Sequence, residues 1–267
     1  MKRNILTVPI ERVENGASLP AQDLVAVEDP LQIRLGDRNI AITMRTPGQD
    51  RELAAGFLLS EGILQRRDQI ESITEDDRGT VTVIPSPEAP IDWDHLARNN
   101  FYVTSSCGVC GKASIDALRS AGCVALPPGR FRIGAVMLAT LPHKLRAAQP
   151  VFEHTGGLHA AGLFNAAGEL LELREDVGRH NAVDKLIGAA FLENRLPLNE
   201  CALMLSGRVS FELVQKSVMA GIPVIAAVGA PSSLAVETAL RFGITLVGFL
   251  RDARFNVYSL PERICGD

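Results

Sequence analysis

The chain has 267 residues, of which 46% are hydrophobic and 22% charged, enough to bury a core in one large domain or two modest ones. This composition excludes a disordered tail, a collagen-like chain and a disulfide-stapled miniprotein. A net charge of −4 disfavours nucleic acid as the main partner, because proteins that bind duplex DNA are usually basic.

The N-terminus lacks the features of a targeting or membrane segment. The apolar stretch at residues 5–10 is too short for a signal peptide and already contains Thr7 and Pro9. No other segment reaches the ~18 unbroken apolar residues of a membrane helix. We therefore expect a cytoplasmic protein with no membrane partner. In such a reducing compartment, its five cysteines favour thiol or metal chemistry over structural disulfides.

The first hundred residues predict short strands around one helix, which together form a smaller α+β part over residues 1–100. Apolar and polar residues alternate in the expected strands, and Asp-Pro and Gly-Asp turns separate several of them. The expected strands are 24–27, 31–35, 40–44, 70–74 and 80–84. Residues 50–59 have helical spacing and precede Gly62, a stop signal.

Residues 101–267 predict a second, α/β domain with a cysteine pair near its start. An amphipathic helix is expected over residues 134–148, with Pro142 either kinking it or marking its true start. Residues 158–164 and 169–173 predict a hairpin joined by a turn that ends in glycine.

The last hundred residues alternate helices with apolar strands. The expected order is helix 178–193, strand 202–205, helix 209–220, strand 223–228, helix 232–242 and strand 245–250. This alternation indicates right-handed crossovers and a parallel sheet with helices on both faces. Ligands bind beyond the carboxyl ends of such strands, so residues 206–208, 229–233 and 250–254 are candidate ligand loops. Their glycines fit simple turns equally well.

The cysteine pair lies in Ser-Ser-Cys-Gly-Val-Cys-Gly-Lys, with thiols at Cys107 and Cys110. A helix expected just after Cys110, together with the charge of Lys112, would lower the cysteine pKa and favour the reactive thiolate. Gly108 and Gly111 leave the segment free of bulk. These features indicate a reactive thiol rather than a core cysteine.

Several chemistries use a cysteine pair. A structural zinc site needs four ligands, but Cys123, Cys201 and Cys265 are isolated, so we expect no metal. A zinc deaminase is excluded because no histidine begins a His-x-Glu motif and no cysteine follows proline. A phosphate-binding loop is excluded because its motif requires glycine at position 106 and serine or threonine at position 113, where this chain has Ser106 and Ala113. Thiol–disulfide exchange and sulfur relay through a persulfide remain open.

Two further segments contain candidate site residues. His159 ends a Gly-rich turn, where a structural role is the commoner one. Residues 174–185 are dense in ionisable groups, and we expect Asp176 to cap a helix with Arg179 and His180 in its first turn. Such a segment is either a solvated helix start or the lining of a site for an anionic ligand such as a phosphate.

Five motifs together resemble those of the FdhD family, the accessory sulfurtransferases of formate dehydrogenase. They are Ser-Cys-Gly-Val-Cys-Gly, Thr-Gly-Gly-Leu-His-Ala-Ala, Glu-Asp-Val-Gly-Arg-His-Asn-Ala-Val-Asp-Lys, Ser-Gly-Arg-Val-Ser-Phe-Glu-Leu-Val-Gln-Lys and Leu-Val-Gly-Phe-Leu-Arg. The resemblance runs in order over residues 24–258.

The resemblance implies an enzyme, a persulfide-based sulfurtransferase. Such a protein takes sulfur from a cysteine desulfurase and delivers it to the Mo-bis(molybdopterin guanine dinucleotide) cofactor, which is its bound substrate. This step of molybdenum cofactor maturation is required for formate dehydrogenase activity. The resemblance also implies a cytidine-deaminase-like sheet without zinc, a smaller N-terminal part, and a cytoplasmic homodimer.

The same resemblance assigns the site residues. The persulfide-carrying residue falls on Cys107 and the second motif cysteine on Cys110. The cofactor-binding stretch falls on a strand end already identified above as a candidate ligand loop. Its residues are Phe249, Leu250, Arg251, Asp252, Ala253 and Arg254. A non-catalytic molybdenum-cofactor chaperone and a thiol–disulfide oxidoreductase are the alternative functions.

Overall fold

The N-terminal residues form a hairpin and a four-stranded sheet in the computed structural model, which describes residues 4–93, 96, 124–127, 129 and 131–266. The hairpin strands are β1 (Ile5–Glu14) and β2 (Ala17–Ala26). The sheet, in the order β4-β3-β6-β5, contains β3 (Asp29–Leu35), β4 (Arg38–Arg45), β5 (Ile70–Glu75) and β6 (Thr80–Pro85). The helix α1 (Asp50–Ser60) and the short 3-10 turn η1 (Arg67–Gln69) also belong to this part.

A six-stranded sheet with the order β13-β12-β11-β10-β8-β9 forms the larger part. Its strands are β8 (His159–Phe164), β9 (Leu170–Asp176), β10 (Ala202–Leu205), β11 (Val224–Ala227), β12 (Thr245–Arg251) and β13 (Arg254–Ser259). The other elements are α4 (Ala135–Ala147), α5 (Pro150–Thr155), α6 (Arg179–Leu192), α7 (Phe211–Ala220), α8 (Ser233–Phe242), η2 (Pro261–Arg263), and the short paired strands β7 (Ile133–Gly134) and β14 (Ile264–Cys265).

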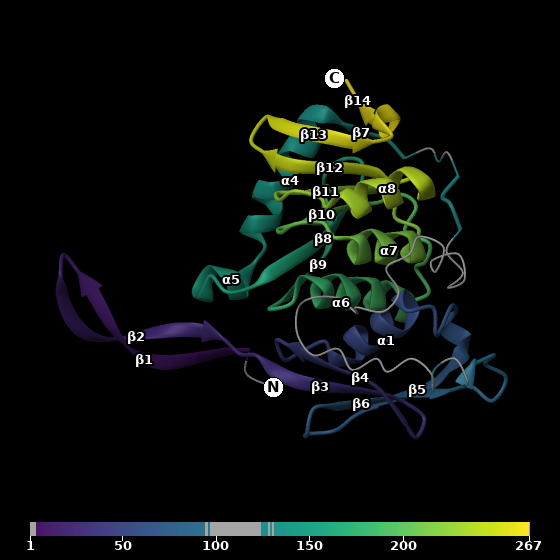
Figure 1. Ribbon diagram of the computed structural model, residues 1–267, viewed down its shortest axis with the longest axis horizontal. Coiled ribbons are helices and arrows are strands. Elements are labelled where there is room, and N and C mark those ends of the chain that lie inside the picture. The colour runs from purple at the N-terminus through teal and green to yellow at the C-terminus, as the bar shows by residue number, and fades with distance from the viewer. Residues whose placement is uncertain (1–3, 94–95, 97–123, 128, 130, 267) are drawn as a thin grey trace.

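The large sheet is buried on both faces. Successive side chains of a strand point to opposite faces of the sheet. Accordingly, successive residues of the central strands belong to two different clusters of buried apolar side chains, one on each face. In β10, Leu203 and Leu205 pack toward α6 and α7, whereas Ala202 and Met204 pack with the apolar residues of α4. Figure 1 shows α6, α7 and α8 on one side of the sheet and α4 on the other. The predicted α/β fold with helices on both faces is confirmed.

The sheet is mixed rather than wholly parallel. The central strands β10, β11 and β12 are parallel, as the alternation of helices and strands predicts. The edges are antiparallel, because β8 and β9 form the predicted hairpin and β13 folds back on β12 through a short turn. The helix α4 runs from Ala135 through Pro142, so this proline does not mark its start.

The N-terminal hairpin was not predicted. It projects away from the rest of the molecule in Figure 1, and most of its side chains are exposed. Its turn contains Asn15 and Gly16, both with positive φ, a strong sequence signal for a two-residue hairpin turn. No helix in the part of the chain that the structure describes is long and apolar enough to span a membrane.

The contact between α1 and α6 joins the two sheets (Figure 1). Two glycines let these helices pack backbone to backbone. A Cβ added at Gly56 would lie 1.9 Å from the carbonyl oxygen of Asp184, and one added at Gly188 would lie 1.8 Å from that of Glu52. A single core cluster contains side chains of the N-terminal sheet, of α1 and of the large sheet. The two predicted parts therefore share one apolar core.

Buried charges reinforce this contact. The Lys216 ammonium of α7 lies 2.8 Å from both carboxylate oxygens of Asp184 in α6. The Ser60 hydroxyl at the end of α1 donates to the same carboxylate at 2.8 Å. The three side chains are at least 95% buried, with exposures of 5% for Lys216, 2% for Asp184 and 0% for Ser60. Removing Lys216 or Asp184 would leave the other as an unpaired buried charge, and removing Ser60 would remove a hydrogen bond to that carboxylate. The group therefore stabilises the three-helix arrangement.

We expect the substitution Gly188→Ala to destabilise the fold by about 1–2 kcal/mol, because overpacking a rigid backbone contact costs up to about 3 kcal/mol and alanine regains ~1 kcal/mol in a helix. Urea denaturation would measure this loss. Gly266→Ala is the control, because a Cβ there meets no atom within 4 Å. Equal stability of Gly188→Ala and the wild type would contradict the close α1–α6 contact.

Candidate functional site

The candidate ligand loops lie together at one edge of the large sheet. Because β10, β11 and β12 are parallel, the residues that follow them meet at their carboxyl ends. The Gly229 amide donates to the Gly207 carbonyl at 3.2 Å, and the Phe249 amide donates to the Gly229 carbonyl at 3.1 Å. The structure thus brings the predicted loops 206–208, 229–233 and 250–254 into one strand-end face.

The stretch assigned to the cofactor by resemblance forms the end of β12 and its turn into β13. Phe249 is 48% exposed and has a positive φ of 53°, whereas the Leu250 side chain is fully buried in the core. Any contact of Leu250 with a ligand would therefore come from its backbone. Asp252 and Ala253 form the exposed turn, and the Asp252 carboxylate lies 3.5 Å from the His143 ring of α4.

Arg251 and Arg254 face each other across this hairpin. Both are exposed, and like charges directly opposite one another in an antiparallel pair repel. A bound anion would relieve that repulsion, and guanidinium groups match the geometry of phosphate oxygens. The turn can therefore hold a phosphate or pyrophosphate group at the strand-end edge.

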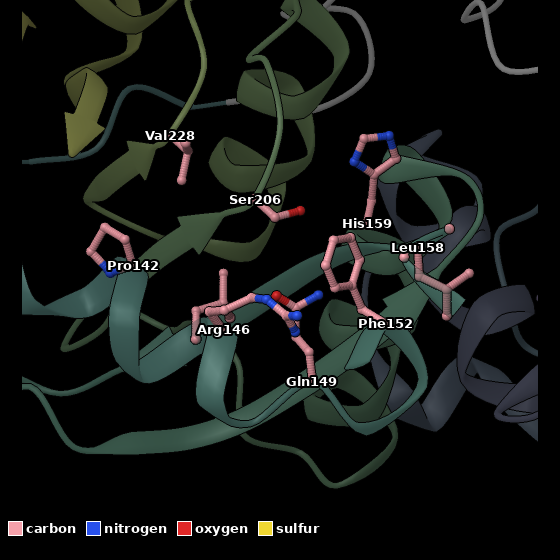
Figure 2. A pocket seen from close by; sticks show the side chains of 11 residues that line it. Pro142, Arg146, Gln149, Phe152, Leu158, His159, Ser206 and Val228 are labelled. Carbon is pink, nitrogen blue, oxygen red and sulfur yellow. The ribbon is translucent and has the colours of Figure 1, made fainter. Parts of the chain in front are cut away.

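A pocket of about 400 Å³ opens beside the same edge, between α4, α5 and the ends of β10 and β11 (Figure 2). The residue after the lining residue Pro142 on α4 is His143, which contacts Asp252 in the turn between β12 and β13. Its lining residues are Pro142, Leu145, Arg146, Gln149, Phe152, Gly156, Gly157, Leu158, His159, Ser206 and Val228. Mostly apolar walls with a few polar groups are typical of small-molecule sites.

Glu175 fixes one wall of the pocket. Its carboxylate, on β9, accepts the backbone N–H groups of Val151 at 3.1 Å and Phe152 at 2.9 Å, in the first turn of α5. The Arg146 guanidinium packs over the Phe152 ring, with Cζ 4.2 Å from the ring centroid. Charge-assisted hydrogen bonds to the free amides of a helix start hold a short helix in place. Phe152 and Arg146 therefore form an ordered stacked pair.

His159 lines the pocket at the start of β8. Burial, followed by electrostatic interactions with Arg179, His180 and Arg208, lowers the pKa of His159 below its ordinary value, and Asp176 opposes this shift. Its ring stands against Gly207, where an added Cβ would come within 3.2 Å of Nδ1. The guanidinium groups of Arg179 and Arg208 lie where the start of α6 meets the strand ends, an arrangement that favours anions.

His180, Ser210 and Glu212 form a second polar cluster between α6 and α7. His180 Nε2 lies 3.0 Å from the Ser210 hydroxyl and 3.8 Å from a Glu212 carboxylate oxygen. The interaction with His180 is the main cause that lowers the pKa of Glu212 to about 2. Both partners contact the same nitrogen, so the cluster lacks the relay geometry of a nucleophilic triad, in which the acid binds the other ring nitrogen. It instead anchors α6 to α7.

Asp176 does not cap α6 as predicted. The N-cap position is Gly178, and the helix has no side-chain cap. The Asp176 carboxylate instead lies 2.7 Å from the Lys185 ammonium, and it also accepts the backbone N–H of Thr46 at 3.1 Å. Both charged side chains are fully buried. Part of the segment 174–185 is therefore neither solvated nor open to a ligand.

Cys107 and Cys110 lie outside the described residues, as do Lys112 and Cys123. Of the other cysteines, Cys201 is buried, which raises the pKa of its thiol, and Cys265 is exposed. Within the ranges that the structure describes, no three His, Cys, Asp or Glu side chains come together as a metal site would require.

Comparison with known proteins identifies the family. A family model described as the FdhD/NarQ family matches residues 26–265, nearly the whole chain. The chain belongs to the FdhD/NarQ family. This membership confirms the resemblance that the five sequence motifs indicate.

Individual members of the FdhD/NarQ family match over most of their length. The chain is 53% identical to the sulfur carrier protein FdhD of Streptomyces avermitilis over 264 residues, covering 95% of this chain and 93% of the relative. It is 43% identical to the protein of that name from Sulfolobus acidocaldarius, covering 97% and 98%. The crystal structure of a proposed formate dehydrogenase accessory protein from Desulfotalea psychrophila superposes with a TM-score of 0.79 at 29% identity, covering 98% of this chain and all of that one.

The sequence alone did not identify several of the residues that line the pocket of this FdhD/NarQ family member. His159 and the loop at Ser206 were singled out, but Arg146, Gln149 and Phe152 were not. The predicted helix ends at residue 148, and α5 is only six residues long, too short for a periodic pattern. Pro150 at the first position of α5 is the one local signal that could have indicated its start.

Replacing His180 by alanine should raise the pKa of Glu212 from about 2 toward its ordinary value of 4.5, because the contact that favours the carboxylate is lost. In the wild type, this contact stabilises the fold fully above about pH 4.5, and the contribution is lost as the pH falls through about 2. Carbon-detected NMR titration of the Glu212 carboxyl measures both values. His154→Ala on α5 is the control, and an unchanged titration in His180→Ala would contradict the assignment.

Proposed function

We propose that this protein is a sulfurtransferase that carries sulfur as a persulfide of Cys107 from a cysteine desulfurase to the Mo-bis(molybdopterin guanine dinucleotide) cofactor, as formate dehydrogenase requires. The observation that carries this proposal is the full-length match to relatives named sulfur carrier protein FdhD. The strand-end face with its paired arginines and pocket supports it, because an anionic dinucleotide needs both features.

The loading step needs no oxidant. The Cys107 thiolate attacks the outer sulfur of the desulfurase persulfide, the sulfur–sulfur bond of the donor breaks, and the donor cysteine leaves as a thiolate. Delivery has two possible routes. Cys110 either displaces sulfide by forming a disulfide with Cys107, which a cellular thiol then reduces, or it receives the outer sulfur in a relay.

The molybdenum cofactor is the bound substrate in this proposal. Arg251 and Arg254 would pair with its phosphate groups, while Phe249 offers an exposed aromatic face to a flat ring. Asp252 would face away from the phosphates in its contact with His143. A Cβ added at Gly248 would lie 3.1 Å from the Gly229 carbonyl oxygen. Because glycine has no side chain, β12 packs closely against the neighbouring loop.

We further propose that the protein works in the cytoplasm as a homodimer, with a cysteine desulfurase and formate dehydrogenase as its protein partners. Its net charge of −4 fits a protein that handles a small anionic ligand through a local basic patch rather than through a basic surface.

Incubation with a cysteine desulfurase and cysteine should add one sulfur atom, about 32 Da, to Cys107, because the thiolate is the nucleophile that accepts the sulfane sulfur. Peptide mass spectrometry without reductant locates the modification. Cys107→Ala should abolish the maturation of formate dehydrogenase, whereas Cys201→Ala, at a buried cysteine, should not.

The alternative functions predict different outcomes. A non-catalytic cofactor chaperone would still mature formate dehydrogenase after Cys107→Ala. A thiol–disulfide oxidoreductase would turn over a generic disulfide through Cys107 and Cys110. Sulfur found elsewhere than on Cys107 would count against the proposed persulfide carrier.

The double variant Arg251→Gln and Arg254→Gln should retain less than about a tenth of the bound cofactor, because each lost charge-assisted contact costs about 1.5–3 kcal/mol. Molybdenum that copurifies with the protein, measured by elemental mass spectrometry, reports the loss. Arg78→Gln, at an exposed turn of the N-terminal sheet, is the matched control. If the double variant copurifies with as much molybdenum as the wild type, the cofactor does not bind at this turn.

A further inference from the structure

The helix α5 contributes to one wall of the pocket but is too small to stay folded by itself. It has six residues, and none of them is buried. Isolated helices shorter than about 12–15 residues are marginal in water, because few hydrogen bonds offset the cost of forming the first turn. The position of α5 therefore depends on its contacts with other parts of the chain.

The residue at the N-cap of α5 does not cap the helix. Gln149 occupies this position, and its side chain accepts no hydrogen bond from the first turn. The side chain is instead buried, with 3% exposure, and its Nε2 has no hydrogen-bond partner among the described residues. Effective N-cap residues have a short side chain with an oxygen that accepts the amide of the second or third helical residue. The first turn of α5 is thus not capped from its own N-cap position.

Glu175 supplies the missing cap from β9. Its carboxylate accepts the N–H groups of Val151 at 3.1 Å and Phe152 at 2.9 Å. These are the second and third residues of α5, the same positions that an N-cap side chain would serve. A carboxylate also interacts favourably with the positive end of a helix. One half-buried side chain therefore fixes α5 against β9.

Glu175 and its neighbour Asp176 act on opposite faces of the sheet, as successive residues of a strand must. The Asp176 carboxylate pairs with Lys185 of α6 in the core, whereas Glu175 binds the start of α5. Only Asp176 belongs to a buried ion pair, and the contact of Glu175 ends at a helix without buried residues. A change at Glu175 can therefore release α5 without unfolding the protein.

We infer that Glu175 is a positioning residue for the cofactor: by capping α5 it sets the fraction of molecules in which this wall of the pocket is in place. The connection runs through Phe152, whose amide binds Glu175 and whose ring stacks with Arg146 at 4.2 Å. Figure 2 shows Phe152, Arg146 and Gln149 together on one side of the pocket. This inference rests on the proposed function, because it takes the cofactor as the ligand of the strand-end face.

The substitution Glu175→Gln tests the inference with little change in shape. The new amide can accept only one of the two N–H groups and presents a donor to the other, so α5 should be docked in a minority of molecules. If about one molecule in ten keeps α5 docked, the apparent affinity falls about tenfold. Isothermal titration calorimetry with guanosine 5′-monophosphate (GMP), the nucleotide part of the cofactor, should measure this loss. Glu169→Gln, exposed in the turn of the β8–β9 hairpin, is the matched control.

Two further measurements separate positioning from a general structural role. Hydrogen exchange measured by mass spectrometry should rise in the α5 peptide of Glu175→Gln and stay unchanged in α6 and the central strands. The unfolding temperature should stay within about 2 °C of the wild type, because α5 has no buried residue. Asp176→Asn should instead lower it clearly, because Lys185 would lose its buried partner.

A second cap provides a rescue. In Gln149→Asp, the carboxylate at the N-cap can bind the same amides as Glu175. Because Gln149 lines the pocket, the GMP affinity of this single variant is the reference for the double variant. Adding Glu175→Gln to Gln149→Asp should weaken GMP binding by less than about twofold, since the two caps serve one helix and their effects are not additive. Equal losses in both backgrounds would show that Glu175 does not act through α5.

The outcomes distinguish the inference from the proposed function. If Glu175→Gln binds GMP as tightly as the wild type, the positioning role is wrong while the sulfur-carrier function stands. A loss of affinity with a general rise in hydrogen exchange would assign Glu175 a structural role and overturn the inference. If GMP does not bind the wild type, and no molybdenum copurifies with it, both the inference and the proposed function are overturned.

Discussion

The close crossing of α1 and α6 is the constraint on which the rest of the structure depends. Gly56 and Gly188 remove the side chains that would separate the two backbones, and nothing larger than hydrogen fits at either position. Because α6 also packs on β8 and β9, the crossing fixes the N-terminal sheet relative to the large one. The start of α6 is then held at the strand-end edge, where Arg179 and His180 meet the loop after β10.

Buried charge pairs fix the position of α6 against its other neighbours. Apolar contacts alone would tolerate a shift of one helix along the other. A buried charge that loses its partner costs the fold several kcal/mol, so ion pairs do not tolerate such a shift. Asp184 is paired with Lys216 of α7, and Asp176 with Lys185 and the backbone of Thr46. These pairs connect α6 to both parts of the protein. We therefore regard the ionisable residues of the segment 174–185 as divided between an internal anchor and a cationic surface at the site.

The sequence predicted the elements whose signals are local. The helix α8 has a serine cap, since the Ala235 amide donates to the Ser232 hydroxyl, and it ends at Gly243 with a positive φ. The parallel strands were predicted as apolar runs, and their order along the chain placed the ligand loops at one edge. The cysteine pair stays a prediction, because Cys107 and Cys110 lie outside the described residues.

What the sequence did not predict depends on partners distant in the chain. The short helix α5 is held by Glu175, more than twenty residues later, so no local pattern announces it. A lysine in a helix is ordinarily exposed, and only the folded structure shows that Lys185 and Lys216 are buried against carboxylates. Gln149 was missed for the same reason, since an unpaired amide is a property of its surroundings and not of its neighbours in sequence.

The strand-end face combines a rigid backbone with exposed side chains. Leu250 is anchored in the core while its neighbours Phe249 and Arg251 are exposed, so the backbone of the turn is fixed and the contacting side chains remain accessible. A deep, closed site would hold a large anionic cofactor tightly and release it slowly. In the proposed function, the open arginine turn and the neighbouring pocket would divide the binding free energy of the cofactor between two contacts. Such a division would let the cofactor leave as a product after it has received sulfur.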